Sequence, residues 1–504
     1  MEFTDALRAL VAVYRSRTDE LLPMYFLSPA VAQVARAVVY AGVAVVYAYL
    51  SATGRLARLR ADLRDSEVAP PRAGAGGDAF RRWFETVAPA FERLVVPEVV
   101  AALGATVLVA LVVFAVLYAV AAAAQLRCCL ATLRDERGTT AAVAGARRHW
   151  RPLLGLAVLQ LVVVALLTGL AAALVAAAAT ASPVAAIAAG LLVVLPWLVA
   201  VVVVRLVFVF AAAAVVVDRT GVRGGLDGGA RFVRANPLWT AGYLLAAVGV
   251  IALVGSVSAA GGPSGGAAGA LLGVVVTSPV LDLLKIALYA DRAGGIDPPA
   301  PPAVTLFDQL RAGVRRGLGA AKAFVLRNPG LHAVATLAFV GGGLAGWTLA
   351  GPYEGVVTAS VEARLEGHAP LSAAVTFATN NTAVAVGSAA SGLAFGVPSV
   401  AALLFNGTLL GVLARLEVAP AVLAAFVAPH GVVEIPALLI AGALGLSLGG
   451  TGWRAATGDA GRADVAAALE RAFWVLVGVA VMLAVAGIVE GLVSPYYFRP
   501  FLGG

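Results

Sequence analysis

The stretch "APHGVVEIPALLIAG", residues 428–442, places a histidine and a glutamate inside a run that is otherwise apolar. His430 and Glu434 are four residues apart, so on a helix they share one face. A histidine beside a carboxylate can tie helices together by hydrogen bonds, carry a proton, or ligate a metal ion.

Other polar residues gather in the same half of the chain. They are Asn380, Asn381, Asn406 and, in "AGIVEGLVSP", Glu490. Lipid cannot satisfy such groups, so we expect them to face the protein interior or water.

Two prolines flank the histidine and the glutamate. Pro429 suits the first turn of a helix, whereas Pro436 is expected to interrupt one. Between them, Gly431 would let another backbone come close. A carbonyl freed by Pro436 needs a donor, which an asparagine amide could supply.

Three interpretations of this polar cluster stay open. In the first, His430 and Glu434 form a hydrogen-bonded knot that holds helices together through the asparagines. In the second, they line a gated or proton-coupled path. In the third they bind metal, but one histidine and one nearby carboxylate fall short of the ligands that zinc needs. The sequence therefore assigns no metal ligand and no cofactor.

Enzyme activity is not expected, and no catalytic residue is assigned. The chain has no serine nucleophile elbow, no HExxH, no phosphate loop and no soluble segment of catalytic size. Its two cysteines, Cys128 and Cys129, are adjacent, which predicts neither a disulfide framework nor a zinc site.

The composition indicates an all-α, polytopic membrane protein in contact with the lipid bilayer. Of the 504 residues, 61% are hydrophobic and 13% are charged, whereas soluble domains are about a quarter charged. Windows of about 20 apolar residues predict about eleven spans. They lie near 30–52, 97–124, 153–179, 184–210, 238–260, 269–290, 331–351, 376–397, 399–416, 429–449 and 468–492.

Arginine-rich loops predict the orientation. Residues 126–151, 218–236 and 291–330 are basic, which places them and the N-terminus in the cytoplasm and the C-terminus outside, in a multi-pass plasma-membrane protein. Parity places the loop 53–96 outside although it carries eight arginines, so its side stays open. The charge of +8 thus reports orientation, and no nucleic-acid partner is expected.

A proline-rich linker, residues 291–304, predicts an exposed spacer between a membrane domain of about six spans (1–290) and one of about five (305–504). Three basic stretches, each with a proline before a span, predict short amphipathic helices at the membrane interface. They read "AGARRHWRPLL", "GGARFVRANPLW" and "RAGVRRGLGAAKAFVLRNPGL". In the first domain, Asp282 and Lys285 are three residues apart and are expected to form an internal ion pair, with a relay role as the alternative.

Small residues recur at four-residue intervals in the second domain, which predicts close packing of membrane helices. These are Ser388, Gly392 and Gly396; Gly407 and Gly411; and Ala441, Gly445 and Gly449.

The order of these signals resembles a known family. "LAFVGGGLAGWTLAG", "TNNTAVAVGSAASGLAFGVPSVAALLFNGTLLG", "PHGVVEIPALLIAGALGLSLG" and "GIVEGLVSP" together look like stage II sporulation protein M over about residues 305–498. The residues that match its motif are Asn381, Asn406, Gly407, Pro429, His430, Gly431, Glu434, Pro436 and Glu490. The first half resembles, more loosely, the membrane domains attached to some glycerophosphodiester phosphodiesterases.

The resemblance implies a membrane scaffold. In spore formers the namesake recruits cell-wall-degrading partners into one complex, so we expect this chain to organise an envelope complex through protein partners. The alternative is a transporter or channel component with the polar cluster along its path. The six-span extension departs from the family, and whether the chain forms a homo-oligomer stays open.

Overall fold

The computed structural model describes residues 3–64, 77–260, 265–292, 295–355, 358–367 and 369–497. In this part of the chain the regular elements are helices and no strand forms; Ala359 and Glu417 pair in one isolated bridge. The first eleven helices are α1 (Phe3–Ser16), α2 (Thr18–Tyr25), α3 (Leu27–Ala52), α4 (Arg55–Arg64), α5 (Gly77–Glu92), α6 (Pro97–Thr132), α7 (Gly138–Ala179), α8 (Pro183–Val217), α9 (Val222–Ala235), α10 (Pro237–Ala260) and α11 (Gly265–Leu272). After the π-helical turn η2 (Gly273–Thr277) come α12 (Ser278–Asp291), α13 (Leu306–Arg327), α14 (Pro329–Ala350), the short η3 (Gly351–Tyr353), α15 (Val361–Leu365), α16 (Pro370–Ser391), α17 (Val397–Leu416), α18 (Pro420–Thr457), α19 (Arg462–Leu492) and α20 (Ser494–Tyr497).

Among the described residues, ten helical segments are long and apolar enough to cross a membrane. This confirms the all-α polytopic prediction. The ten correspond to ten of the eleven predicted spans, with α2 and α3 joined in one segment and α11, η2 and α12 in another. The span predicted at 376–397 is α16, a helix of 22 residues whose "TNNT" run lowers its hydropathy below that of the others.

The chain packs as two units that do not follow the predicted sequential domains. One unit comprises Met1–Tyr25, Ala115–Gly255 and Leu272–Thr305. The other comprises Phe26–Phe114, Ser256–Leu271 and Leu306–Gly504. Residues 26–52 thus pack with the C-terminal helices, because α3 lies against α16 and α17, where the rings of Tyr40 and Phe405 stack 4.7 Å apart.

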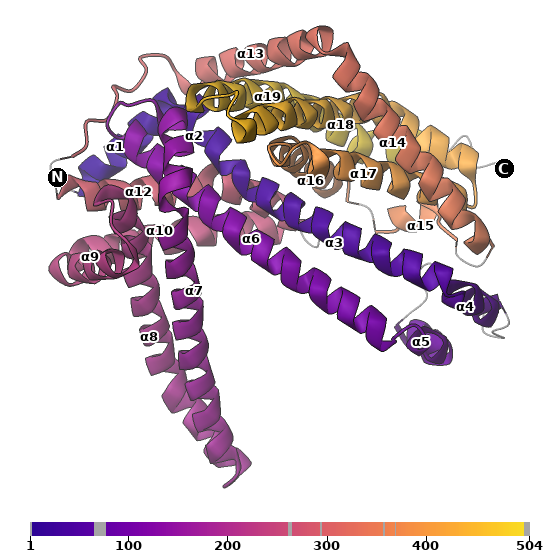
Figure 1. Cartoon of the computed structure of the whole chain (residues 1–504), viewed down its shortest axis with the longest axis horizontal. Coiled ribbons are helices and arrows are strands. Elements are labelled where there is room, and N and C mark those ends of the chain that lie inside the picture. Colours follow the sequence, from indigo (N-terminus) through magenta and orange to yellow (C-terminus); the bar gives the residue numbers. More distant parts are fainter. Residues whose placement is uncertain are drawn as a thin grey trace. The chain divides into compact units, whose positions relative to one another are not determined.

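In the first unit, α7 and α8 form a long antiparallel hairpin (Figure 1). Leucines on both helices are exposed, among them Leu161 and Leu192 at 70% and 76%, as expected of a surface that contacts lipid. The core of this unit is aromatic: the rings of Phe210 and Phe232 lie 4.3 Å apart, and Tyr289 packs against Phe232. Gly229 of α9 lets that helix approach the backbone of α8 closely.

The second unit is a bundle of α3, α13, α14 and α16–α19 (Figure 1), whose helices meet backbone to backbone at glycines. At the contact of α14 and α17, a methyl group added to Gly407 or Gly411 would lie 2.0 Å from the carbonyl oxygen of Phe339 or Gly343. Gly342 and Gly346 of α14 face carbonyls of α17 at 2.2 and 2.1 Å in the same way. The two helices therefore interlock through reciprocal glycine pairs.

Two of the three predicted pre-span helices are separate, namely α9 and α13. Each ends at an asparagine followed by the proline that begins the next helix. The side-chain amide of Asn236 donates to the carbonyl of Phe232, and Asn328 caps Phe324 in the same way, at 3.1 and 2.9 Å. The repeated "FVRANP" and "FVLRNP" are thus matching helix ends.

The first of the three stretches does not form a helix of its own. It is continuous with α7, which contains Pro152 in its interior. The residue before Pro152 is an arginine, which lacks the short side-chain amide that caps the other two helix ends.

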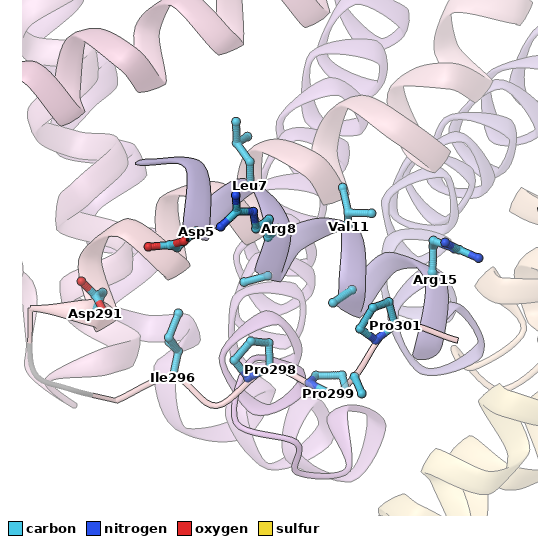
Figure 2. A pocket seen from close by; sticks show the side chains of 13 residues that line it. Asp5, Leu7, Arg8, Val11, Arg15, Asp291, Ile296, Pro298, Pro299 and Pro301 are labelled. Carbon is cyan, nitrogen blue, oxygen red and sulfur yellow. Dashed lines mark hydrogen bonds and ion pairs between the residues drawn. The ribbon is translucent and has the colours of Figure 1, made fainter. Parts of the chain in front are cut away.

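The proline-rich linker is hydrogen-bonded to other segments of its unit, so it is not a free spacer. The Arg134 guanidinium donates to the carbonyl of Gly295 at 2.7 Å, and the Arg15 guanidinium donates to that of Val304 at 2.6 Å. Figure 2 shows the segment with Pro298, Pro299 and Pro301 running along α1, where it lines a cavity of about 980 Å³. Because a guanidinium can only donate hydrogen bonds, both contacts use backbone carbonyls of the linker as acceptors.

The glycine contact between α14 and α17 yields a matched test. We expect Gly407→Ala to lower the free energy of unfolding by about 1–3 kcal/mol, because the new methyl group collides with a backbone carbonyl. Gly341→Ala, on α14 with no atom within 4 Å of the added methyl, should be neutral or stabilising by up to about 1 kcal/mol. Thermal unfolding in detergent measures both, and equal effects would contradict the interlocked contact.

Candidate functional site

The polar cluster begins on α18, which runs without a break from Pro420 to Thr457. Pro429 therefore does not start a helix and Pro436 does not interrupt one; both lie in the interior. A proline inside a helix costs about 3 kcal/mol. A broken helix at membrane depth would instead leave several backbone groups unsatisfied, each at several kcal/mol.

Gly431 does not receive another backbone, contrary to expectation. A methyl group added there would meet only Val427 and Ile435 of its own helix within 4 Å. The close backbone contacts of α18 lie further along, at Gly445 and Gly449. Gly445 and Gly392 face each other, and the Cβ position of Gly449 lies 2.5 Å from the backbone nitrogen of Gly396.

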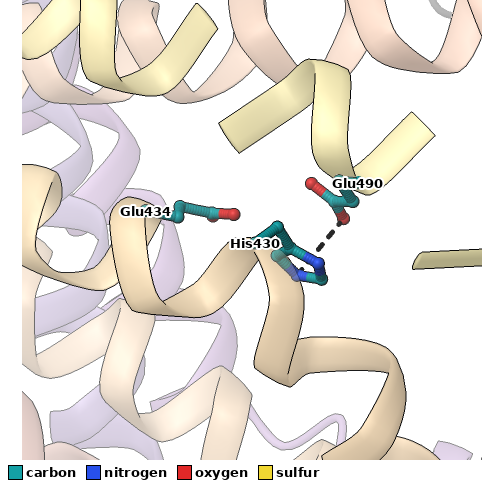
Figure 3. A group of neighbouring side chains, drawn as sticks. All are labelled: His430, Glu434 and Glu490. Atoms are coloured by element: carbon teal, nitrogen blue, oxygen red, sulfur yellow. Dashed lines mark ion pairs between the residues drawn. The ribbon is translucent and has the colours of Figure 1, made fainter. Parts of the chain in front are cut away.

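Three ionisable side chains meet at the contact of α18 and α19. His430 and Glu434 come from α18, and Glu490 comes from the last turn of α19 (Figure 3). One potential ligand atom from each lies within 4.8 Å of the other two. The His430 Nε2 atom is 4.0 Å from Glu490 Oε1. The side chains of His430 and Glu490 are 6% and 13% exposed, so the group is largely removed from solvent.

Neighbouring hydrogen bonds orient two members of this cluster. The Asn381 amide of α16 donates to Glu434 Oε1 at 2.9 Å. His430 Nδ1 lies 2.9 Å from the Ser494 hydroxyl, at the start of α20. The cluster therefore connects α16, α18, α19 and α20.

The other two predicted asparagines lie apart from it. Asn380 is exposed, and its amide lies 3.3 Å from the side-chain oxygen of Asn381. Asn406 donates to the carbonyl of Ala402 on its own helix at 2.8 Å. The amides of Asn380, Asn381 and Asn406 donate to Asn381 Oδ1, Glu434 Oε1 and the Ala402 carbonyl, respectively, so none supplies the donor expected for the carbonyl freed by Pro436.

Some residues around the cluster were not singled out from the sequence. Gly487 and Gly491 bracket Glu490 and bring α19 against the backbone of Ala374 and Ala378 on α16. Their four-residue spacing was a usable signal, as it was for Gly342 and Gly346. No sequence pattern pointed to Ser494, because only the turn after α19 brings its hydroxyl next to His430.

Asp282 and Lys285 lie in the other unit, as a pair on α12. The Lys285 ammonium is 2.6 Å from Asp282 Oδ1, and the Tyr25 hydroxyl donates to Asp282 Oδ2 at 2.9 Å. The Tyr25 hydroxyl also lies 3.2 Å from the thiol of Cys129. The pair is thus part of a buried network, a structural setting in which both charges have partners.

The fold and the cluster together define a multi-pass helical membrane protein with a glycine-packed bundle that contains a largely buried His–Glu–Glu group. Residues 335–495 match the family model of stage II sporulation protein M. This confirms the resemblance of the C-terminal half and covers the polar cluster and the glycine contacts of α14 and α16–α19. No curated protein and no solved structure matches the chain. The looser likeness of the first half stays a prediction.

The Asn381–Glu434 hydrogen bond is open to a double-mutant cycle. In the presence of a chelator, which removes any bound cation, Glu434→Ala should destabilise the bundle by about 1–3 kcal/mol, because the Asn381 amide loses its partly buried acceptor. Glu434→Gln keeps an acceptor oxygen and should cost less. The cycle with Asn381→Ala, measured by thermal unfolding, should give a coupling of at least about 0.5 kcal/mol. Additive effects would contradict the bond.

Proposed function

We propose that the chain is a membrane scaffold that organises an envelope complex. The observation that carries this proposal is the set of glycine contacts that join helix to helix in the second unit, from which we infer a rigid bundle. Gly317 of α13 meets Gly478 of α19, which in turn packs on α16 through Gly487 and Gly491. Contacts of this kind leave no layer of side chains along which helices could slide. A rigid platform suits the docking of partners.

The amphipathic helix α13 supplies a docking surface. Its Gly317 and Ala321 are buried against α19, whereas Phe307 and Leu310 are 73% and 67% exposed. The exposed basic residues of the helix are Arg311, Arg315, Arg316, Lys322 and Arg327. An apolar edge next to a basic one fits a partner helix or a protein segment at the membrane surface.

The second candidate function is a transport or channel component. The observation that favours it is the His430, Glu434 and Glu490 group itself, because ionisable residues inside spans often mark ion or proton paths. The two functions differ in what the group does. A proton path fails with Glu434→Gln, since glutamine cannot exchange a proton, whereas a scaffold keeps its shape.

Site-specific cross-linking tests the scaffold. A photoreactive residue at Phe307 or Leu310 should give one defined protein adduct in native membranes, and the same adduct with Glu434→Gln. The matched control is Leu337, which is 72% exposed on the spanning helix α14 and should give lipid adducts. Lipid adducts alone at all three positions would contradict docking on α13. Flux in proteoliposomes that Glu434→Gln abolishes would make transport the leading function.

We infer that the protein lies in the plasma membrane with the N-terminus in the cytoplasm and the C-terminus outside. This requires α16 to cross the membrane as an eleventh span. α16 packs against α3, α18 and α19, and the Asn381 amide is bonded to Glu434, so this asparagine need not meet lipid. A reporter that is active only outside the cell should be active when fused to the C-terminus and inactive at the N-terminus. Activity at neither end would contradict eleven crossings.

A further inference from the structure

We propose that His430, Glu434 and Glu490 bind one divalent transition-metal ion, with zinc as the reference ion. The sequence argued against a metal because it offered one histidine and one adjacent carboxylate. The fold adds Glu490 from α19, which makes a set of three ligands. This inference does not depend on the docking role of the chain.

The geometry is close to that of a metal centre. All three ligand atoms lie within 4.8 Å of one another, and Figure 3 shows the two carboxylates converging on the imidazole from different helices. Bonds of about 2.0–2.2 Å to zinc place tetrahedral ligands roughly 3.5 Å apart. Ligand atoms at the 4.8 Å limit would have to approach one another by roughly 1.3 Å to share one ion.

The surrounding hydrogen bonds have the pattern of an outer ligand shell. When His430 Nδ1 donates its proton to Ser494 Oγ, Nε2 keeps a lone pair on the side that faces Glu490. Asn381 donates to one oxygen of Glu434 and leaves the other free to bind the ion. Such partners fix the orientation of histidine and carboxylate ligands in metal sites.

Charge balance favours a cation. Two carboxylates this close, on side chains that are mostly buried, repel each other and need a proton or a positive ion between them. A divalent ion would neutralise both at once. Glu490 lies two residues before the end of α19 at Leu492.

The ligand types select the class of metal. An imidazole with two carboxylates suits zinc or a similar first-row ion better than calcium or magnesium, which prefer oxygen ligands alone. Three protein ligands leave a fourth position for water. The bound ion would link α18 to α19 and, through Ser494, to α20.

Metal analysis of the full chain tests this proposal. The protein is purified in detergent with a tag that contains no histidine or cysteine, stripped with chelator, and titrated with Zn²⁺. We expect one zinc per chain by elemental mass spectrometry and a higher midpoint of thermal unfolding. Glu490→Gln and His430→Gln should each weaken binding at least about 10-fold. His332→Asn, at a histidine outside the cluster on α14, should bind like the wild type.

Two results would overturn the proposal. One is a folded wild-type chain that binds no stoichiometric zinc. The other is unchanged binding in both Glu490→Gln and His430→Gln, which would place the ion elsewhere. If a variant does not fold, the visible absorption spectrum of Co²⁺ added to the wild-type protein decides. Bands typical of a four- or five-coordinate site with nitrogen and oxygen ligands would support the proposal. The spectrum of hydrated Co²⁺ would overturn it. None of these results changes the cross-linking expected at Phe307 and Leu310 of α13, so the metal site and the scaffold can fail independently.

Discussion

The second unit depends on helices that touch at the backbone. At Gly407 and Gly411 of α17, backbone carbonyl oxygens of α14 occupy the space that a Cβ atom of α17 would need. Lipid provides no hydrophobic drive for helices to associate, so such contacts gain their stability from dispersion forces over a close interface. The same arrangement recurs between α16 and α18, between α16 and α19, and between α13 and α19. Each interface is possible only because glycine has no side chain, so the bundle has little freedom to repack.

This close packing offsets the free-energy cost of burying the polar group within the bundle. Ionisable residues at membrane depth are costly unless they face partners. Gly487 and Gly491, near Glu490 on α19, bring that helix against α16, which carries Asn381. Asn381 of α16 and Ser494 of α20 orient Glu434 and His430. A hydrogen-bonded knot and a metal centre are compatible, since the same outer contacts serve both. Both arrangements hold helices together, which the proposed scaffold would require.

Much of this could be predicted from residue types and spacing. Hydropathy indicated ten of the spans that the structure contains, and four-residue intervals pointed to Gly407, Gly411, Gly445 and Gly449. Long-range pairing could not be predicted. No local pattern tells that α3 packs with α16, or that Glu490 and Ser494 reach His430 across at least 60 positions. The continuity of α18 through two prolines was missed because the proline rule comes from water, where a broken helix can be hydrated.

The scaffold proposal requires that the bundle is rigid and does not alternate between states. Hydrogen–deuterium exchange of the full chain in lipid nanodiscs tests it most directly. We expect the amides of α18 on both sides of Pro436 to exchange as slowly as those of α14 and α17, with one population of each peptide. Fast exchange or two populations in α18, with α14 and α17 protected, would show a hinged helix. That result would contradict the scaffold and favour a transport path through the polar cluster.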